Sequence, residues 1–197
     1  AFFIAVTKDS TQGEGTWLVD YTIDGRRAAT GGMATTGSLT RWIRDELAKD
    51  LVEKEKNGGE NAYAALFREA EGIPAGSDGL LVLPYFQGER MPIQDPRAKG
   101  TFFGLNLSHT RGHLIHAAFE GVGYGIAQNL QLLRNSGIEV ECAMAVGGGT
   151  RSLRWLQVVS DICGITQKVP EVGVGASYGD ALMAGLAIGA IASPEEL

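Results

Sequence analysis

The chain has 197 residues, with 17 Lys and Arg against 23 Asp and Glu, so its formal net charge is −6. A hydrophobic share of 44% with 20% charged residues is typical of one globular domain and excludes a disordered chain. The acidic balance argues against a nucleic-acid-binding protein, and the longest run without polar side chains, 12 residues over 181–192, is shorter than the roughly 18 that a membrane span needs.

The first half of the chain predicts strands before helices. Runs rich in aromatic and β-branched residues predict strands, and the polar segment between the first two runs is typical of a hairpin or meander. Apolar residues at helical spacing predict the helices that follow. In chain order we expect strands at 2–8, 16–24 and 26–34, helices at 39–56 and 60–71, and a short buried strand at 80–83.

A long loop punctuated by prolines leads into the second half, where helices and strands alternate. The expected elements are a helix at 108–135, a strand at 142–146, a helix at 151–163, a strand at 166–169 and a helix at 177–191. Strands that lead and then alternate with helices indicate the α/β class with a mixed sheet. No linker divides the chain, which therefore forms one domain.

Two cysteines, Cys142 and Cys163, are too few for a disulfide framework. We expect reduced, partly buried thiols in a cytoplasmic protein, with a disulfide bridge as the alternative. The chain also opens inside a strand-like pattern and lacks an initiator Met, so we expect a piece of a longer polypeptide.

The sharpest local feature is a strand that ends in Gly147, Gly148 and Gly149, with a helix close behind at Ser152. Without Cβ atoms the backbone can approach a ligand closely, and the helix N-terminus favours phosphate oxygens. A tight turn without a ligand is the alternative. The loop is not a P-loop, because no Gly-Lys-Ser/Thr follows it.

The same loop also fits a second nucleotide-binding interpretation. Gly147-x-Gly149-x-x-Ser152 nearly matches a dinucleotide fingerprint, and Glu171 stands about 20 residues further on, after the next strand. The third position is Ser rather than Gly, which weakens the match. An NAD-binding domain therefore remains open.

Glycines inside two expected helices indicate close packing against a neighbouring element. Gly121, Gly123 and Gly125 lie in the long helix, where each costs about 1 kcal/mol relative to Ala. Gly185 and Gly189 continue a spacing of four from Ala181 in the last helix. We interpret both sets as packing surfaces, with a ligand contact as the alternative for the last helix.

The three histidines, His109, His113 and His116, fall on one face of the long helix. No nearby carboxylate before Glu120 completes a ligand set, so we expect ordinary surface or interface hydrogen bonds and no metal site. Glu89, Arg90 and Asp95 lie in the long loop. We expect them to form hydrogen bonds that hold its turns, and a contact with the cleft or with a partner is the alternative. Their spacing alone does not decide between these roles.

Several motifs follow one another along nearly the whole chain. They are Gly79–Pro92 (GLLVLPYFQGERMP), Asp95–Leu105 (DPRAKGTFFGL), Leu107–Arg111 (LSHTR), His113–Gly121 (HLIHAAFEG), the triple-glycine loop with Ser152, Trp155 and Gln157, and Tyr178–Gly185 (YGDALMAG). Together, and in this order, they closely resemble the FGGY family of carbohydrate kinases, nearest to its xylulose-kinase-like members.

The resemblance implies a lobe of the ribonuclease H-like, actin-like ATPase fold, with a mixed β-sheet and helices on both faces. Residues 1–197 would be the C-terminal, nucleotide-side domain, and the N-terminal lobe would be absent from this chain. The family's glycine loop holds adenosine and its α-phosphate side, a role that carries onto Gly147, Gly148, Gly149 and Ser152, where some relatives have Asn at the last position. A second, phosphate-side glycine carries onto Gly37, ahead of Trp42.

The resemblance also implies a function for the full-length protein. It would transfer the γ-phosphoryl group of ATP, with Mg²⁺, to a hydroxyl of a small sugar, for which a ketopentose such as xylulose is expected. The catalytic Asp belongs upstream of residue 1, so this chain would hold no catalytic residue and be inactive by itself. Its partners would be the sugar, ATP and its own N-terminal lobe, with a homodimer left open.

Two alternatives belong to other functional classes. One is the Rossmann-like NAD-binding domain introduced above. The other is a non-catalytic lobe that senses a nucleotide or a sugar and binds a partner. The first predicts a preference for NAD over ADP, and the second predicts binding without phosphoryl transfer.

Overall fold

The computed structural model describes residues 2–7, 16–21, 25–171, 173 and 175–194. Its first sheet contains β1 (Phe2–Thr7), β2 (Trp17–Asp20) and β3 (Arg27–Gly32), with β3 in the middle and antiparallel to both neighbours. The expectation of a hairpin or meander over the first two strands was therefore wrong, because β1 and β2 both pair with β3 rather than with each other. The expected strand ends at residue 8 and residues 22–24 lie outside the described residues.

The first sheet has one buried and one exposed face. Phe3, Ala5 and Leu18 pack against the core, together with the buried Ala29 of β3. On the opposite face, small residues of β3 lie between larger, exposed side chains of the two outer strands. These exposed side chains are Ile4, Val6, Trp17 and Val19.

The expected helix over 39–56 forms in three parts: α1 (Gly37–Trp42), the π-helical η1 (Ile43–Leu47) and α2 (Lys49–Lys56). Leu39, Ile43 and Leu51 are buried, as the spacing predicts, whereas Leu47 is exposed. The π turn explains the difference, because its extra residue rotates the side chains that follow it away from the α-helical stripe. The second expected helix is α3 (Ala62–Arg68).

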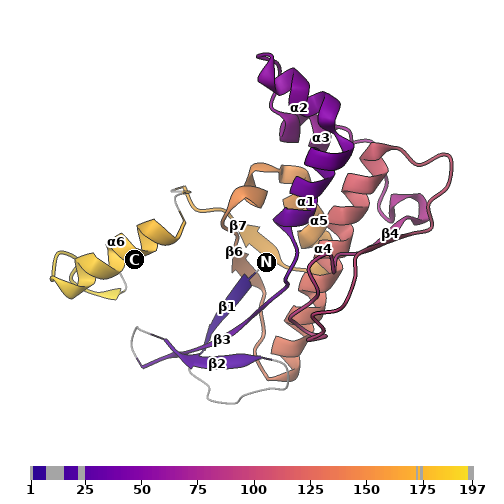
Figure 1. The fold of residues 1–197 in the computed structure, drawn as a ribbon. Helices are drawn as coiled ribbons and strands as arrows, with labels where there is room; N and C mark the ends of the chain where they lie inside the picture. Colours follow the sequence, from indigo (N-terminus) through magenta and orange to yellow (C-terminus); the bar gives the residue numbers. More distant parts are fainter. Residues whose placement is uncertain (1, 8–15, 22–24, 172, 174, 195–197) are drawn as a thin grey trace.

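A 25-residue helix, α4 (Arg111–Asn135), packs against α3, α5 (Leu153–Cys163) and β4 (Leu81–Leu83) and lies on the right-hand side of Figure 1. The short 3₁₀ turn η2 (Ser77–Gly79) leads into β4 (Leu81–Leu83), which packs on α4 and pairs antiparallel with β5 (Thr101–Phe103). Sequence reasoning missed β5, whose three residues lie inside the proline-rich loop. A strand this short carries no periodic signal.

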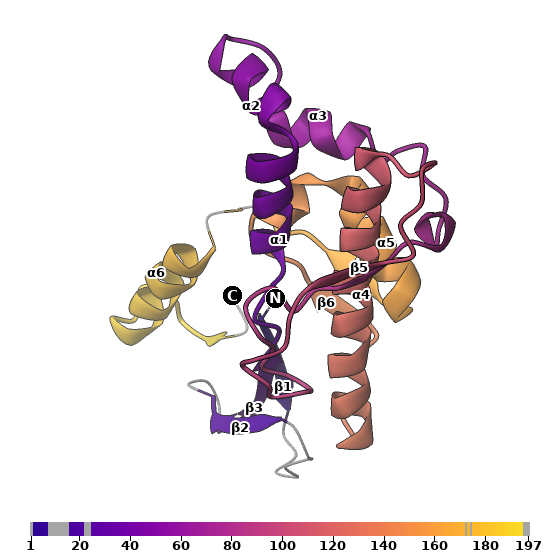
Figure 2. The same ribbon diagram turned by 45° about the vertical axis from the view of Figure 1, so that its right-hand side comes forward.

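The last third contains a β-α-β unit and a final helix. Strand β6 (Cys142–Met144), the 3₁₀ turn η3 (Gly148–Arg151), helix α5 (Leu153–Cys163) and strand β7 (Thr166–Lys168) follow in order, and β6 and β7 pair in parallel. Helix α6 (Ala176–Ala187) stands apart from the rest of the molecule in both views (Figures 1 and 2), with every side chain at least partly exposed.

The expected α/β class is confirmed, since strands lead and then alternate with helices along the chain. Antiparallel and parallel pairing are both present, but among the described residues they occupy three separate sheets rather than one continuous mixed sheet. In the same part of the chain, no helix is both long and apolar enough to cross a membrane. Both cysteines are free thiols, Cys163 buried and Cys142 exposed.

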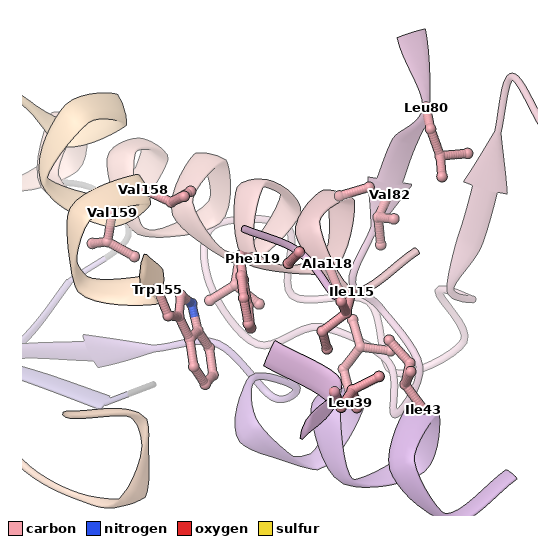
Figure 3. Close-up of a cluster of buried hydrophobic side chains, with 14 of the residues drawn as sticks. Leu39, Ile43, Leu80, Val82, Ile115, Ala118, Phe119, Trp155, Val158 and Val159 are labelled. Carbon is pink, nitrogen blue, oxygen red and sulfur yellow. The ribbon is translucent and has the colours of Figure 1, made fainter. Parts of the chain in front are cut away.

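One hydrophobic core joins α4 to the elements around it (Figure 3). Phe119 of α4 is fully buried at its centre, with the Trp155 ring of α5 stacked on it at a centroid distance of 5.1 Å. Phe67 of α3 meets the Phe119 ring edge-on, also at 5.1 Å. Side chains from α1 and β4 close the cluster, so this core fixes the start of α1 relative to the start of α5.

Candidate functional site

The glycine loop between β6 and α5 has the backbone expected of a ligand-binding turn. Gly147 has φ 99° and ψ −174°, a conformation that is essentially restricted to glycine. Gly147 and Gly148 are exposed, and a Cβ atom at either position would meet no described atom within 4 Å. Packing within the described structure therefore does not explain Gly148.

Gly149 and Ser152, the other two residues of the expected loop site, connect the loop to helix α5. A Cβ atom on Gly149 would lie 3.3 Å from the Trp155 ring, so Gly149 rests directly on that side chain. Ser152 is buried and caps α5, since its hydroxyl accepts a hydrogen bond from the Trp155 backbone N–H at 3.2 Å. Its hydroxyl oxygen thus holds the start of α5.

Gly37, the second expected nucleotide-binding glycine, begins α1 and is exposed. Here too a Cβ atom would meet no described atom within 4 Å. Gly37 and the triple-glycine loop precede two helices, α1 and α5, that contribute side chains to the same hydrophobic core. The shared core therefore fixes the starts of these two helices relative to each other.

The proline-rich loop braces the segment that leads to Gly37. Buried Glu89 accepts a hydrogen bond from the Ala34 backbone N–H at 2.7 Å, and Arg90 donates to the Met33 carbonyl at 3.3 Å. Asp95 accepts from the Arg97 backbone N–H at 2.8 Å. The expectation of structural turn chemistry holds for Asp95, but Glu89 reaches further and positions the connection between β3 and α1.

A buried polar network surrounds His116 of α4, which sequence reasoning assigned to the surface or an interface. This assignment was wrong: His116 is 1% exposed. Arg154 donates to its Nε2 at 3.0 Å, so Nδ1 carries the proton and donates to the Ser77 hydroxyl at 2.9 Å. The Ser77 hydroxyl then donates to Glu120 at 2.6 Å. The spacing of His116 and Glu120 could have revealed their pairing, but Ser77 and Arg154 are too distant in sequence.

Glu120 ends this chain of hydrogen bonds as the acceptor. Burial acts to raise the pKa of its carboxyl group, but hydrogen bonds from His116, Ser77 and the Gly76 backbone N–H outweigh it and lower the pKa. The carboxylate therefore stays charged and joins η2 to the middle of α4. Because His116, Ser77 and Glu120 are all buried, we interpret the network as structural.

Two further sequence hypotheses concern metal and dinucleotide ligands. Among the described residues, no group of three or more His, Cys, Asp and Glu side chains could hold a metal ion. Glu171 is exposed beyond the end of β7. Its place after a β-α-β unit is the one a ribose-binding carboxylate would take in an NAD-binding domain. The geometry alone is therefore compatible with two interpretations of the loop, a kinase nucleotide site and an NAD-binding domain. Comparison with known proteins distinguishes between them.

Residues 1–188 match the C-terminal domain of the FGGY family of carbohydrate kinases. The chain is 37% identical over 175 residues to a gluconokinase of Bacillus subtilis, an alignment covering 88% of this chain and 34% of that protein. It is 33% identical over 135 residues to a xylulose kinase of the same bacterium, covering 68% and 27% of the two chains. The crystal structure of xylulose kinase from Rhodospirillum rubrum superimposes with a TM-score of 0.74 at 34% identity, over 93% of this chain and 36% of that one.

These relatives are much longer than this chain, which spans about a third of their length. The span that matches the family domain, residues 1–188, contains both glycine turns and the β-α-β unit. The dinucleotide-binding interpretation loses its support, because the same loop and strands are accounted for by a kinase domain.

Proposed function

Since the chain belongs to the FGGY family of carbohydrate kinases, as its C-terminal domain, we propose that it forms the nucleotide-binding half of a cytoplasmic sugar kinase. The full-length protein would transfer the γ-phosphoryl group of ATP to a hydroxyl of a small sugar. The observation that carries this proposal is a pair of exposed glycine turns, at Gly37 and at Gly147 and Gly148, where no described atom occupies the place of a Cβ.

The residues of this chain would bind and orient the nucleotide. Backbone N–H groups of Gly147, Gly148 and Gly149 would lie along the adenosine and its α-phosphate side, and Gly37 along the later phosphates. Ser152 holds the start of α5 and offers its hydroxyl proton to the ribose or phosphate. Catalysis of this type depends mainly on positioning and on stabilisation of charge, which is why backbone donors on a rigid core suffice here.

The chemistry of transfer would be completed from outside this chain. The catalytic Asp, the phosphate-binding hairpin and most sugar contacts are expected upstream, in the N-terminal lobe. Mg²⁺ would enter with the phosphates and neutralise their charge, and we assign it no ligand among the residues described here. The chain alone should therefore bind nucleotide weakly and transfer nothing.

The identity of the sugar is a separate question from the type of reaction. The sequence motifs favour a ketopentose such as xylulose, and relatives named xylulose kinase support it. The gluconokinase of Bacillus subtilis is 37% identical to this chain and the xylulose kinase of the same bacterium 33%, so gluconate is the second candidate. Both would be phosphorylated by the same nucleotide half, because substrate choice lies in the site and not in the fold.

A steric test of the nucleotide loop follows from the open space at Gly148. In the intact kinase, Gly148→Val should raise KM for ATP at least about tenfold, as expected when a side chain blocks a close backbone contact. KM for the sugar should stay unchanged. Gly72→Val is the matched control, because a Cβ at Gly72 also meets no described atom within 4 Å but lies in a turn after α3. Equal effects of the two substitutions would contradict the proposal.

A further inference from the structure

Arg154 occupies a position where local electrostatics disfavour a cation. It is the second residue of α5, after Leu153 and two positions beyond the N-cap Ser152. The first turn of a helix carries a partial positive charge from its backbone N–H groups, so a guanidinium there is repelled. The Nε atom of Arg154 is also buried and has no hydrogen-bond partner in the described part of the chain. Local structure alone therefore does not account for an arginine at this position.

Contacts with distant parts of the chain do account for it. Nη2 of Arg154 donates to the Ile73 carbonyl oxygen at 2.8 Å and to Nε2 of His116 at 3.0 Å. Ile73 lies between α3 and η2, 81 residues earlier, and His116 is buried in α4. Arg154 therefore ties the first turn of α5 to two other parts of the core.

The hydrogen-bonded network balances the charge of Arg154 and gives its contact with the core a direction. His116 connects the guanidinium through the Ser77 hydroxyl to the Glu120 carboxylate, so a cation and an anion are joined by two buried neutral side chains. Apolar packing is non-directional, whereas a hydrogen bond weakens steeply outside a narrow range of distance and angle. The bonds of Arg154 therefore restrict rotation and shift of the first turn of α5 more tightly than the ring stacking beside it does.

The first turn of α5 supports the glycine loop. A Cβ on Gly149 would lie 3.3 Å from the Trp155 ring, and Ser152 accepts from the Trp155 backbone N–H at 3.2 Å. Arg154 directly precedes Trp155, so the loop, the helix cap and the anchored arginine are continuous in the chain. If the first turn shifts, the backbone N–H groups of the loop move with it. A misplacement of about 1 Å is enough to cost a positioned contact much of its effect.

We propose that Arg154 is a positioning residue for the nucleotide. Through His116 and Ile73 it holds the glycine loop in the orientation that binds ATP, without touching the nucleotide itself. The inference rests on the proposed kinase function and adds a determinant of nucleotide affinity outside the two glycine turns. A side chain that breaks a local rule, here a cation at a helix N-terminus, is expected where function requires a fixed geometry.

The test is the KM for ATP of the intact kinase after Arg154→Met, which keeps a long side chain but removes both donated hydrogen bonds. We expect KM for ATP to rise about threefold to tenfold, the factor that corresponds to the net contribution of a hydrogen bond. KM for the sugar should stay unchanged, and kcat should fall by a smaller factor. Arg154→Lys, which keeps the charge and an N–H donor on a shorter side chain, should raise KM for ATP by less. All rates are measured at a temperature where circular dichroism shows each variant to be folded.

Arg111→Met and Arg111→Lys are the matched controls. Arg111 is the first residue of α4 and likewise ties a helix start to distant parts of the chain, through Asp50 and Glu69, but α4 carries neither glycine turn. These substitutions should lower stability and leave KM for ATP unchanged. If Arg154 only stabilised the fold, its variants would behave in the same way, with fewer active molecules, a lower apparent kcat and an unchanged KM for ATP. That result, or an equal rise of KM for ATP at both arginines, would overturn the proposal.

The same comparison remains decisive if Arg154→Met does not fold. Arg154→Lys should then raise KM for ATP above that of Arg111→Lys, and equal values would contradict the proposal. Absence of Mg-ADP binding to the wild-type protein would overturn the proposed function and this inference with it. A wild-type protein that binds Mg-ADP, with an unchanged KM for ATP in the Arg154 variants, would overturn this inference alone.

Discussion

Buried charge in this molecule is stabilised by donors that come from distant parts of the sequence. Glu120 of α4 accepts from Ser77 and from the Gly76 backbone N–H, more than 40 residues earlier. His116 is held in one tautomer because Arg154 can only donate to it. A residue pattern shows which side chains can form hydrogen bonds. It does not show which donors from distant parts of the sequence the fold places next to them. For this reason the histidine face was misjudged from the sequence.

The Glu120 carboxylate should make stability depend on pH. Its pKa is lower in the folded state than the ordinary value of 4.5, so its contribution is complete above that value and is lost as the pH falls towards the folded pKa. Glu120→Ala, which strands the Ser77 hydroxyl and the Gly76 N–H, should cost about 1–3 kcal/mol at pH 7. Urea unfolding of both proteins between pH 7 and acid should show this difference shrinking as the pH falls. A constant difference would contradict the account.

Helix packing explains glycines that helix propensity alone disfavours. The packing interpretation of Gly121, Gly123 and Gly125 is confirmed, since a Cβ at each would meet Val82, Ile162 or Met33 at less than 3 Å. Gly185 packs in the same way on Ile191. For Gly189 the interpretation was wrong: no described atom lies within 4 Å of a Cβ there, and φ of +72° explains the residue instead. Spacing predicts a shared helix face, but not what lies against it.

The backbone contact of Gly121 leads to a prediction of opposite sign from helix propensity. Ala in place of Gly should gain about 1 kcal/mol in a helix interior. A Cβ on Gly121, however, would lie 2.5 Å from the Val82 carbonyl oxygen in β4. Gly121→Ala should therefore lower the free energy of unfolding by about 1–3 kcal/mol, as overpacking does.

Gly123→Ala serves as the comparison, because its Cβ would meet the terminal Cδ1 atom of Ile162 at 2.8 Å, which can rotate away. We expect its free energy of unfolding to change by less than that of Gly121→Ala in urea titrations. A stabilised Gly121→Ala protein would show that β4 does not pack on α4 as described.

At the scale of the whole molecule, the order and type of elements were predictable, and their pairing was not. Periodicity located the helices 111–135 and 153–163 to within a few residues, because their apolar faces are long. The pairing of β1 and β2 with β3 depends on contacts between strands that carry no local signal. The glycine turns stood out because three consecutive glycines are unusual, whereas the hydrogen bond from the Ala34 backbone N–H to Glu89 joins residues 55 apart in the sequence and was visible only in the structure.

Cys163 should report on the unfolding of the whole core. Burial raises the pKa of its thiol to about 11, so its reactive thiolate is scarce in the folded protein at neutral pH, whereas Cys142 is exposed. Titration with a disulfide reagent should modify one thiol quickly, and the second only when urea unfolds the core. Rapid modification of both thiols in the native protein would mean that α5 does not stay packed on α4.

The central claim is that the two glycine turns bind an adenine nucleotide for phosphoryl transfer. Titration of the ¹⁵N-labelled chain with Mg-ADP and, separately, with NAD tests it most directly, because amide shifts detect weak binding residue by residue. The kinase domain predicts shifts centred on Gly37 and on Gly147 to Ser152 with Mg-ADP. Stronger shifts with NAD, extending to Glu171, would contradict the claim and favour a dinucleotide-binding domain.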